Sequence, residues 1–147
     1  KYAFKCGGGI NHRMGLYDAA MIKENHIAWS NNIDNAIAMI RLNTPFTTHI
    51  IVEAENISQA KEAILAGADS ILLDEIEPNI LRDNISFLRE IRLHNDCKEG
   101  SKNLIIEVSG INPDEIENYI IEGINLISTS AATTKSKWID FSMRYID

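Results

Sequence analysis

The 147-residue sequence has little cysteine and no long apolar run. Its two cysteines, Cys6 and Cys97, lie far apart and form no Cys-x-x-Cys motif, which favours reduced thiols over a disulfide framework. No apolar stretch approaches the length of a membrane span, and no secretory leader precedes the first motif. We therefore expect a cytoplasmic protein that does not enter a membrane.

Positive charge is also scarce. The chain carries 14 Lys and Arg against 21 Asp and Glu, for a formal net charge of −7, and no basic face can be picked out. A nucleic-acid partner is therefore not expected. The 45% hydrophobic content is ordinary for a soluble protein, and the length suits one domain with a substantial core.

Short apolar runs rich in branched residues predict strands that are buried on both faces, as in parallel sheets. Four of them span 49–53, 70–74, 104–109 and 124–129, and 20–23 is a shorter fifth. Helical patterns lie between them at 30–42, at 58–66, from Pro78, and from the Asn112 cap with Pro113 in the first turn. Alternating strands and helices predict an α/β fold with a parallel sheet, either a barrel or an open doubly wound sheet.

Each predicted strand ends in a polar residue. These residues are Lys23, Glu53, Asp74, Ser109 and the run 128–130. In barrels and in open α/β sheets the carboxyl ends of parallel strands form the edge where ligands bind. We therefore expect these side chains to surround one pocket.

The charges at this edge sort into three groups. His12 and Arg13 follow three glycines, 7–9, and with Lys23 they form a cationic group suited to carboxylates. Glu53 and Asp74 suit ribose hydroxyls or Mg²⁺. Backbone N–H groups at Ser109, Gly110, Ser130 and Ala131 could bind a phosphate. A phosphorylated sugar with a metal-bound leaving group, beside a carboxylated acceptor, would satisfy all three groups.

The segment 7–27 closely resembles the signature region of the quinolinate phosphoribosyltransferases. Later blocks at 52–55, 66–74, 107–110 and 140–144 follow in that family's order and near its spacing. The resemblance implies a transferase that converts quinolinate and phosphoribosyl pyrophosphate to nicotinate mononucleotide, pyrophosphate and CO₂ with Mg²⁺, in NAD biosynthesis. It also implies an incomplete, open TIM-like α/β barrel over 1–139, a C-terminal strand at 140–147, and a dimer that needs an N-terminal domain.

The resemblance also implies a role for each predicted site residue. His12, Arg13 and Lys23 would hold the quinolinate carboxylates. Glu53 and Asp74 would bind the ribose and its metal, with Lys23, Glu53 and Asp74 as the catalytic group. Ser109, Gly110 and the loop of Ser130 and Ala131 would bind the 5′-phosphate.

Three positions depart from the family's pattern. Ile111 stands where a second glycine is usual, Ser130 replaces a glycine, and Thr134 stands where a basic residue is expected, with Lys135 next to it. The family's N-terminal domain, and a preceding strand that bears Arg and Lys, are not part of this sequence. These observations keep two alternatives open: a truncated barrel that at most binds phosphates, and a related transferase for another aromatic acid.

Simpler roles are also weighed for single residues. Taken singly, His12 would be a surface or core-edge histidine, and Glu53 or Asp74 would be a solvated strand end or a helix cap. Glu55 and Glu107 are expected to be structural partners, and Trp29 and Trp138 to be packing residues. Open sheet edges predict that the isolated chain forms oligomers or aggregates.

Overall fold

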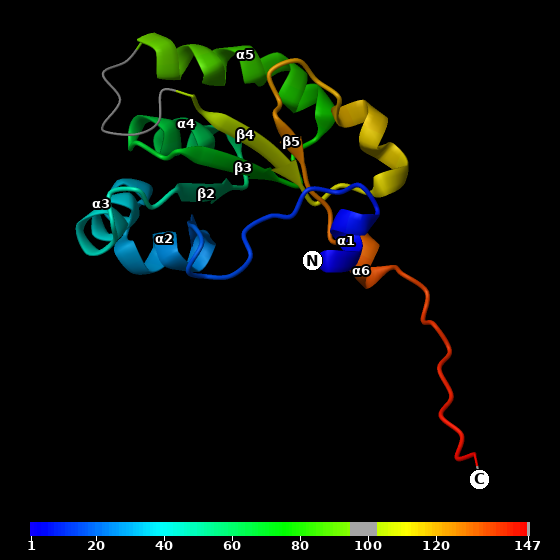
Figure 1. Ribbon diagram of the computed structural model, residues 1–147. Coiled ribbons are helices and arrows are strands. Elements are labelled where there is room, and N and C mark those ends of the chain that lie inside the picture. The colour runs from blue at the N-terminus through cyan, green and yellow to red at the C-terminus, as the bar shows by residue number, and fades with distance from the viewer. Residues whose placement is uncertain (95–102, 147) are drawn as a thin grey trace.

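A single parallel sheet forms the centre of the molecule in the computed structural model, which describes residues 1–94 and 103–146. Its five strands lie side by side in chain order (Figure 1). They are β1 (Ala20–Ile22), β2 (Ile50–Ala54), β3 (Ser70–Asp74), β4 (Ile105–Ser109) and β5 (Leu126–Ile127). All five predicted strands are confirmed. The polar composition of residues 98–102 predicts a loop there, and this segment lies outside the described residues.

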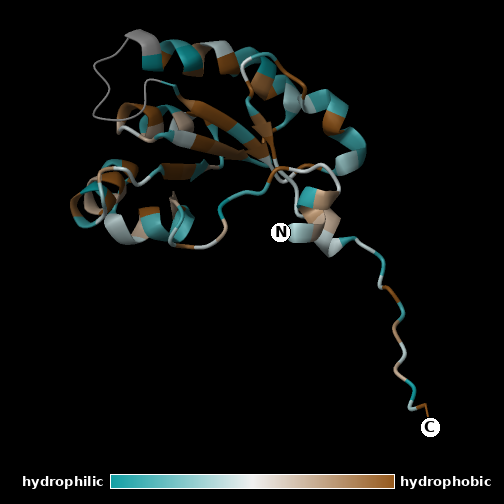
Figure 2. Cartoon of the chain, in the orientation of Figure 1, coloured by the Kyte–Doolittle hydropathy of each residue, from teal (hydrophilic) through white to brown (hydrophobic). Residues whose placement is uncertain are grey.

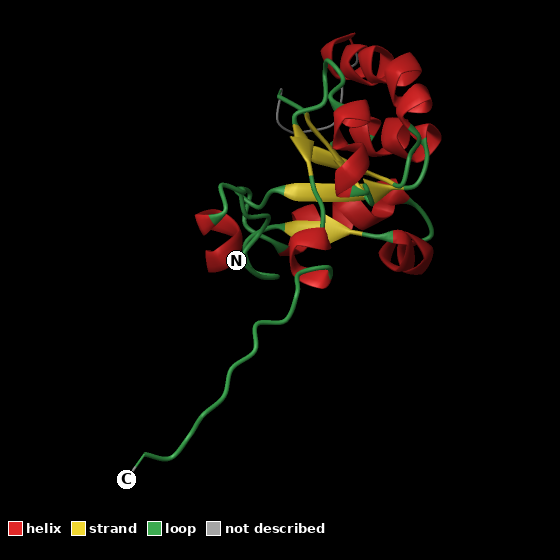
Figure 3. Cartoon of the chain, turned by 90° about the vertical axis from the view of Figure 1, so that its right-hand side faces the viewer, coloured by secondary structure: helices red, strands yellow, loops and turns green. Residues whose placement is uncertain are grey.

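Helices connect successive strands. Two of them, α2 (Glu24–Ser30) and α3 (Ile33–Asn43), join β1 to β2, α4 (Ile57–Leu65) joins β2 to β3, and α5 (Pro78–His94) follows β3. A 3₁₀ helix, η1 (Pro113–Tyr119), lies between β4 and β5, and the short α1 (Tyr2–Cys6) and α6 (Ala131–Thr134) lie near the ends. Because parallel crossovers are right-handed, strands in chain order place their helices on one face. Figure 3 shows the main helices on one side of the strands and the N-terminus on the other.

The core lies between the sheet and this helical layer. Alternate residues of each strand point toward α3, α4 and α5. Figure 2 shows apolar residues, in brown, along the strands and on the helices. A fully buried Ile or Leu side chain contributes about 1.5–3 kcal/mol. The core residues, each at most 3% exposed, include Ile22, Ile50, Val52, Ile71, Leu73, Ile106 and Val108 from strands and Ile33, Ile37, Ile64, Leu81, Ile85 and Leu88 from helices.

The sheet is open at both ends, as expected for an incomplete barrel. In residues 1–94 and 103–146, β1 pairs with β2 alone and β5 pairs with β4 alone. The prediction of an open α/β barrel is therefore confirmed. The residues that follow α6 run away from the sheet (Figure 1), and the strand predicted at 140–147 pairs with no strand of the described chain.

The helix predicted over 30–42 is confirmed as α3, whereas α2 was not predicted and two other local expectations are wrong. Asn31, with a left-handed φ of 71°, ends α2 just before α3 begins. Asn32 rather than Ser30 caps α3, since its side chain accepts a hydrogen bond from the Asn35 N–H at 2.7 Å. The helix after Asn112 is 3₁₀ rather than α.

The two tryptophans do not pack in this fold. Trp29 is 90% exposed and Trp138 is 100% exposed, so their expected packing role is also wrong. Within the described ranges, no helix combines the length and the apolar character that crossing a membrane requires.

Candidate active site

The alternation that builds the core turns the other half of each strand to the opposite side. We call this side, away from α3, α4 and α5, the open face of the sheet. The described residues on it include Met21, Ile51, Glu53, Leu72, Asp74, Glu107, Ser109 and Leu126. The predicted acidic residues and Ser109 therefore share one face, at the carboxyl ends of their strands.

One row of side chains crosses the open face from β1 to β5. The pairing register aligns Glu53 with Leu72, Leu72 with Glu107, and Glu107 with Leu126. Lys23 directly follows β1 and forms an ion pair with Glu53. The row thus holds two carboxylates, each next to Leu72, and one cation at its end.

The Lys23–Glu53 pair joins the ends of the first two strands. The Lys23 ammonium group donates to Glu53 Oε2, and 43% of the Lys23 side chain is exposed against 14% of Glu53. The Lys23 ammonium therefore remains within reach of solvent while it neutralises a largely buried carboxylate.

A second pair lies one row further along the strands. The Ser109 hydroxyl donates to Asp74 Oδ1, and the Glu75 N–H donates to the Ser109 carbonyl at 3.2 Å. Gly110 follows with φ of +73°, a conformation that other residues rarely adopt. This turn holds the Asp74 carboxylate against the end of β4.

A third pair connects the glycine-rich N-terminal loop to the sheet. His12 Nε2 lies 3.4 Å from Glu107 Oε2, and His12 Nδ1 accepts a hydrogen bond from the Arg13 N–H at 2.8 Å. The Arg13 guanidinium donates to the Ala19 carbonyl at 2.8 Å. The loop therefore places His12 on the open face, whereas Arg13 is bonded to the backbone just before β1.

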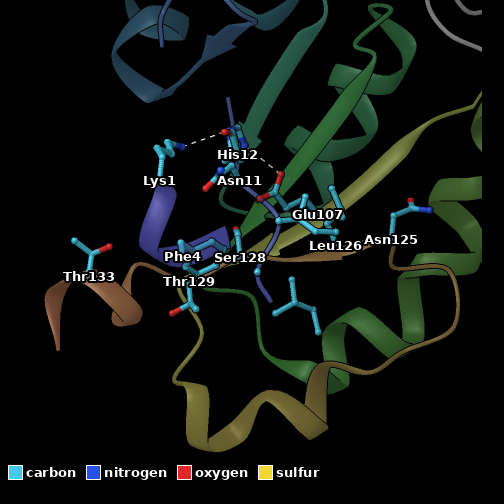
Figure 4. Close-up of a pocket in the computed structure, with 13 residues that line it drawn as sticks. Lys1, Phe4, Asn11, His12, Glu107, Asn125, Leu126, Ser128, Thr129 and Thr133 are labelled. Atoms are coloured by element: carbon cyan, nitrogen blue, oxygen red, sulfur yellow. Dashed lines mark hydrogen bonds and ion pairs between the residues drawn. The ribbon is translucent and has the colours of Figure 1, made fainter. Parts of the chain in front are cut away.

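Two cavities lie beside these pairs of residues. The larger, of about 550 Å³, is bordered by His12, Glu107, Ser128 and other residues of α1, β4 and β5, and Figure 4 shows His12 and Glu107 pointing toward each other in it. The smaller, of about 330 Å³, brings together the predicted phosphate-binding residues Gly110, Ser130 and Ala131. It is also lined by Glu75, Ile111, Thr134 and Lys135, among others.

The structure brings the predicted site residues together in part. Lys23 with Glu53 and Asp74 with Ser109 are direct contacts, whereas the Arg13 side chain contacts the Ala19 carbonyl instead. Glu107, expected as a structural partner, borders the larger cavity beside His12. The alternation of side chains along a strand could have predicted this position, because Glu107 precedes Ser109 by two residues and so lies on the same face of the sheet.

The donor set suits Mg²⁺ more than a protein-ligated transition metal. In the part of the chain that the structure describes, no three His, Cys, Asp or Glu side chains cluster to hold a metal. Mg²⁺ usually takes one or two carboxylates together with substrate phosphates. Glu53 and Asp74, on neighbouring strands of one face, fit that requirement.

Residues 1–144 match the family model described as "Quinolinate phosphoribosyl transferase, C-terminal domain". The chain belongs to this family. The resemblance noted in the sequence is thereby confirmed, and the match extends over every residue of the candidate site.

Curated relatives agree with this assignment. The probable carboxylating nicotinate-nucleotide pyrophosphorylase of Methanothermobacter thermautotrophicus is 39% identical over 97% of this chain and 49% of its own length. The human carboxylating nicotinate-nucleotide pyrophosphorylase is 29% identical over 98% of this chain and 46% of its own length. The chain thus spans about half the length of the curated relatives that it matches.

Solved structures share the fold. The crystal structure of a NadC deletion mutant superposes with a TM-score of 0.80 at 35% identity, over 100% of this chain and 49% of that one. NadC from Streptococcus pyogenes gives a TM-score of 0.79 at 35% identity, over 99% of this chain and 47% of its own. Over the part that it covers, the chain therefore shares its fold with these solved structures.

Proposed function

We propose that this chain forms the catalytic barrel of an enzyme that transfers the phosphoribosyl group of phosphoribosyl pyrophosphate to quinolinate. The products are nicotinate mononucleotide, pyrophosphate and CO₂, a step of NAD biosynthesis. The observation that carries the proposal is the open face itself, where Lys23, Glu53 and Asp74 lie at the carboxyl ends of adjacent parallel strands and Glu107 lies within β4 on the same face. Family membership supports the same reaction.

In this reaction the cations orient the acceptor. Quinolinate carries two carboxylates, and we assign their binding to His12, Arg13 and Lys23. The Lys23 ammonium is within reach of solvent and can exchange its bond to Glu53 for one to a substrate carboxylate. Fixing the pyridine nitrogen beside the anomeric carbon supplies orientation, which is a large part of the rate enhancement for a reaction between two bound molecules.

The carboxylates act on the sugar. Loss of pyrophosphate leaves an oxocarbenium-like ribose, and Glu53 and Asp74 can stabilise this positive charge electrostatically. Both side chains lie on the open face, so they can also bind the ribose hydroxyls and Mg²⁺. When bound, Mg²⁺ neutralises the charge of the departing pyrophosphate.

Decarboxylation then needs no further group from the protein. Once the pyridine nitrogen carries the ribose it is cationic, and the ring accepts the electron pair that the adjacent carboxylate leaves behind. CO₂ departs, the ring carbon takes a proton from solvent, and no covalent enzyme intermediate forms. The 5′-phosphate occupies the smaller cavity, against Gly110, Ser130 and Ala131.

We propose that the complete enzyme works as a cytoplasmic dimer in which an N-terminal domain, in addition to this chain, completes the pocket. The open sheet edges support the dimer, and the relatives' greater length supports the additional domain.

The test is release of CO₂ from carboxyl-labelled quinolinate in the presence of phosphoribosyl pyrophosphate and Mg²⁺. The chain is assayed alone and together with the N-terminal domain of the Methanothermobacter relative, supplied as a separate polypeptide. We expect release in the mixture and none from either part alone. A mixture in which both parts are folded but release no CO₂ would contradict the proposal.

A second candidate is a barrel that binds phosphates without catalysis. The smaller cavity favours it, because Gly110, Ser130, Ala131 and Lys135 line a space that suits a phosphate. Ile111 lines the same space at a position where the family pattern has a second glycine, which is a departure from that pattern. Tight binding of ribose 5-phosphate, with no CO₂ release in the mixture, would support this second candidate.

A third possibility, transfer to another aromatic acid, is separated by competition. Nicotinate carries one carboxylate and quinolinate two. A preference for nicotinate would contradict the assignment of Arg13 and Lys23 to two carboxylates.

A further inference from the structure

Glu107 occupies a position that the sheet alone would give to an apolar residue. It is 4% exposed, and in the pairing register it lies between Leu72 on β3 and Leu126 on β5. Burying a carboxylate between two leucines is unfavourable unless a partner compensates it. A hydrophobic residue of similar volume at such a site is often as stable or more stable. The carboxylate therefore has a role other than packing.

The partner of Glu107 is the His12 ring, and the ring's protonation is determined by its other contact. His12 Nδ1 accepts the Arg13 N–H at 2.8 Å, and a ring nitrogen that accepts a hydrogen bond carries no proton. In the neutral imidazole the proton is therefore on Nε2, which lies 3.4 Å from Glu107 Oε2. The protonated nitrogen is thus the one that lies at ion-pair distance from the carboxylate.

The loop that carries His12 is held from both sides. The Lys1 side chain donates to the carbonyls of His12 at 3.0 Å and Arg13 at 2.9 Å, and Figure 4 shows Lys1 above the larger cavity. The Arg13 guanidinium holds the Ala19 carbonyl at 2.8 Å. Glu107 adds the contact that joins this loop to the open face of the sheet, within the cavity wall.

We propose that Glu107 is a positioning residue, whose carboxylate fixes the orientation of the His12 ring at the wall of the larger cavity. The inference rests on the proposed function in one respect: His12 is taken to face the quinolinate. Glu107 itself is assigned no contact with substrate. Through His12 it sets where a carboxylate of quinolinate is bound.

Three variants separate positioning from packing. Glu107→Met keeps the volume and suits the two neighbouring leucines, but it removes the acceptor. Glu107→Gln keeps an acceptor oxygen and removes the charge. Leu72→Met is the matched control, since it introduces the same side chain in the same row with similar burial and leaves the carboxylate in place.

The first readout needs no activity. In a ¹H–¹⁵N spectrum of the histidine-labelled chain, we expect an Nε2–H signal from His12 that is protected from exchange with water. Glu107→Met should lose this signal, whereas Glu107→Gln and Leu72→Met should retain it. His26 is an internal reference, because its Nδ1 also accepts a backbone N–H, at 3.0 Å, on an exposed helix.

The second readout is kinetic, in the mixture with the N-terminal domain. We expect Glu107→Met to raise the KM for quinolinate roughly ten- to hundredfold, as misplacement of a substrate-orienting group does, and to change the KM for phosphoribosyl pyrophosphate less than threefold. Glu107→Gln should stay within about threefold of the parent for both substrates. Urea unfolding monitored by circular dichroism should give Glu107→Met a midpoint no lower than that of Leu72→Met.

The outcomes are distinguishable. Retention of the His12 signal in Glu107→Met, or an equal rise of both KM values, would overturn the positioning role. If the parent mixture is inactive, the proposed function fails, and the spectrum alone still decides whether Glu107 positions His12.

Discussion

The two edges of the sheet use polar side chains in different ways. At the N-terminal edge they bind the backbone. Arg41 donates to the carbonyls of Thr48 at 2.9 Å and Gly67 at 3.3 Å, and to Asp69 Oδ2 at 2.7 Å. The same Asp69 oxygen accepts the Ile50 N–H at 2.8 Å. These contacts tie α3 to the starts of β2 and β3.

Arg89 also binds backbone groups at the N-terminal edge of the sheet, beside the starts of β4 and β5. Its guanidinium donates to the carbonyls of Gly123 and Leu104 and to the Asn125 side chain, which itself accepts the Ile106 N–H at 2.9 Å. Burial lowers the pKa of the Arg89 guanidinium from its ordinary value, and the group stays charged at neutral pH. This cluster ties α5 to the starts of β4 and β5.

On the open face and at the C-terminal edge, polar side chains bind one another. Lys23 pairs with Glu53, Asp74 with Ser109, and Glu107 with His12. A side chain that holds a backbone group cannot leave without disturbing the fold, whereas a side chain that holds another side chain can exchange its partner for a ligand. The difference predicts that substitutions at the first edge change stability and that substitutions at the second change activity.

The largest effect is expected at Lys23. Lys23→Met should lower quinolinate-dependent CO₂ release a hundred- to thousandfold, equivalent to about 3–4 kcal/mol of barrier, because the orienting cation is lost. Its ion pair is partly exposed, so the free energy of unfolding should change by about 1 kcal/mol or less. The measurement is the CO₂ assay together with urea denaturation.

Lys61→Met on α4 is the matched control. Its ammonium lies 5.8 Å from the Phe87 ring, on the helical layer away from the open face. If the activity of Lys23→Met were within threefold of that of Lys61→Met, the assignment of Lys23 to the active site would be wrong.

At the N-terminal edge the effect should move to stability. Asp69→Ala removes a buried carboxylate that holds both Arg41 and the Ile50 N–H, and we expect a loss of about 3 kcal/mol in the free energy of unfolding. The folded fraction should retain its activity. Glu90→Ala, an exposed acidic position on α5, should change stability by less than about 0.5 kcal/mol. Equal losses in the two variants would break the distinction between the edges.

Gly110 lies at a position where a substitution should affect both stability and ligand binding. Its φ is +73°, and an added Cβ would meet the Glu75 side chain and the Glu75 backbone nitrogen, the latter at 3.1 Å. We expect Gly110→Ala to cost about 2 kcal/mol of stability and to weaken binding of ribose 5-phosphate. Gly8→Ala is the control, since Gly8 has φ of +89° and open space around its Cβ position, so it should cost about 1 kcal/mol. Equal costs, measured by urea denaturation, would exclude the contact with Glu75.

The strands and the polar ends at the site could be predicted because burial on both faces leaves a continuous apolar run that stops at a polar residue. The boundary between α2 and α3 could not be predicted from the sequence. Ser30 and Asn32 are both favourable caps, and only the left-handed turn at Asn31 decides between them. The role of Glu107 could not be predicted either, because in sequence it is a single acidic residue within an apolar strand. Its contact with His12 joins residues that are 95 positions apart, and no local sequence pattern connects them.

The smallest predicted effect tests whether the bonding partner, rather than the location, determines the role. Asn56 follows β2 at the C-terminal edge, close in sequence to Glu53, yet its side chain accepts the backbone Gln59 N–H at 2.9 Å and caps α4. Asn56→Ala should therefore cost about 1 kcal/mol of stability and leave CO₂ release unchanged, and Asn56→Asp should restore the stability. If Asn56→Ala instead lost activity without losing stability, the location of a residue at the C-terminal edge, and not its hydrogen-bond partner, would determine its role.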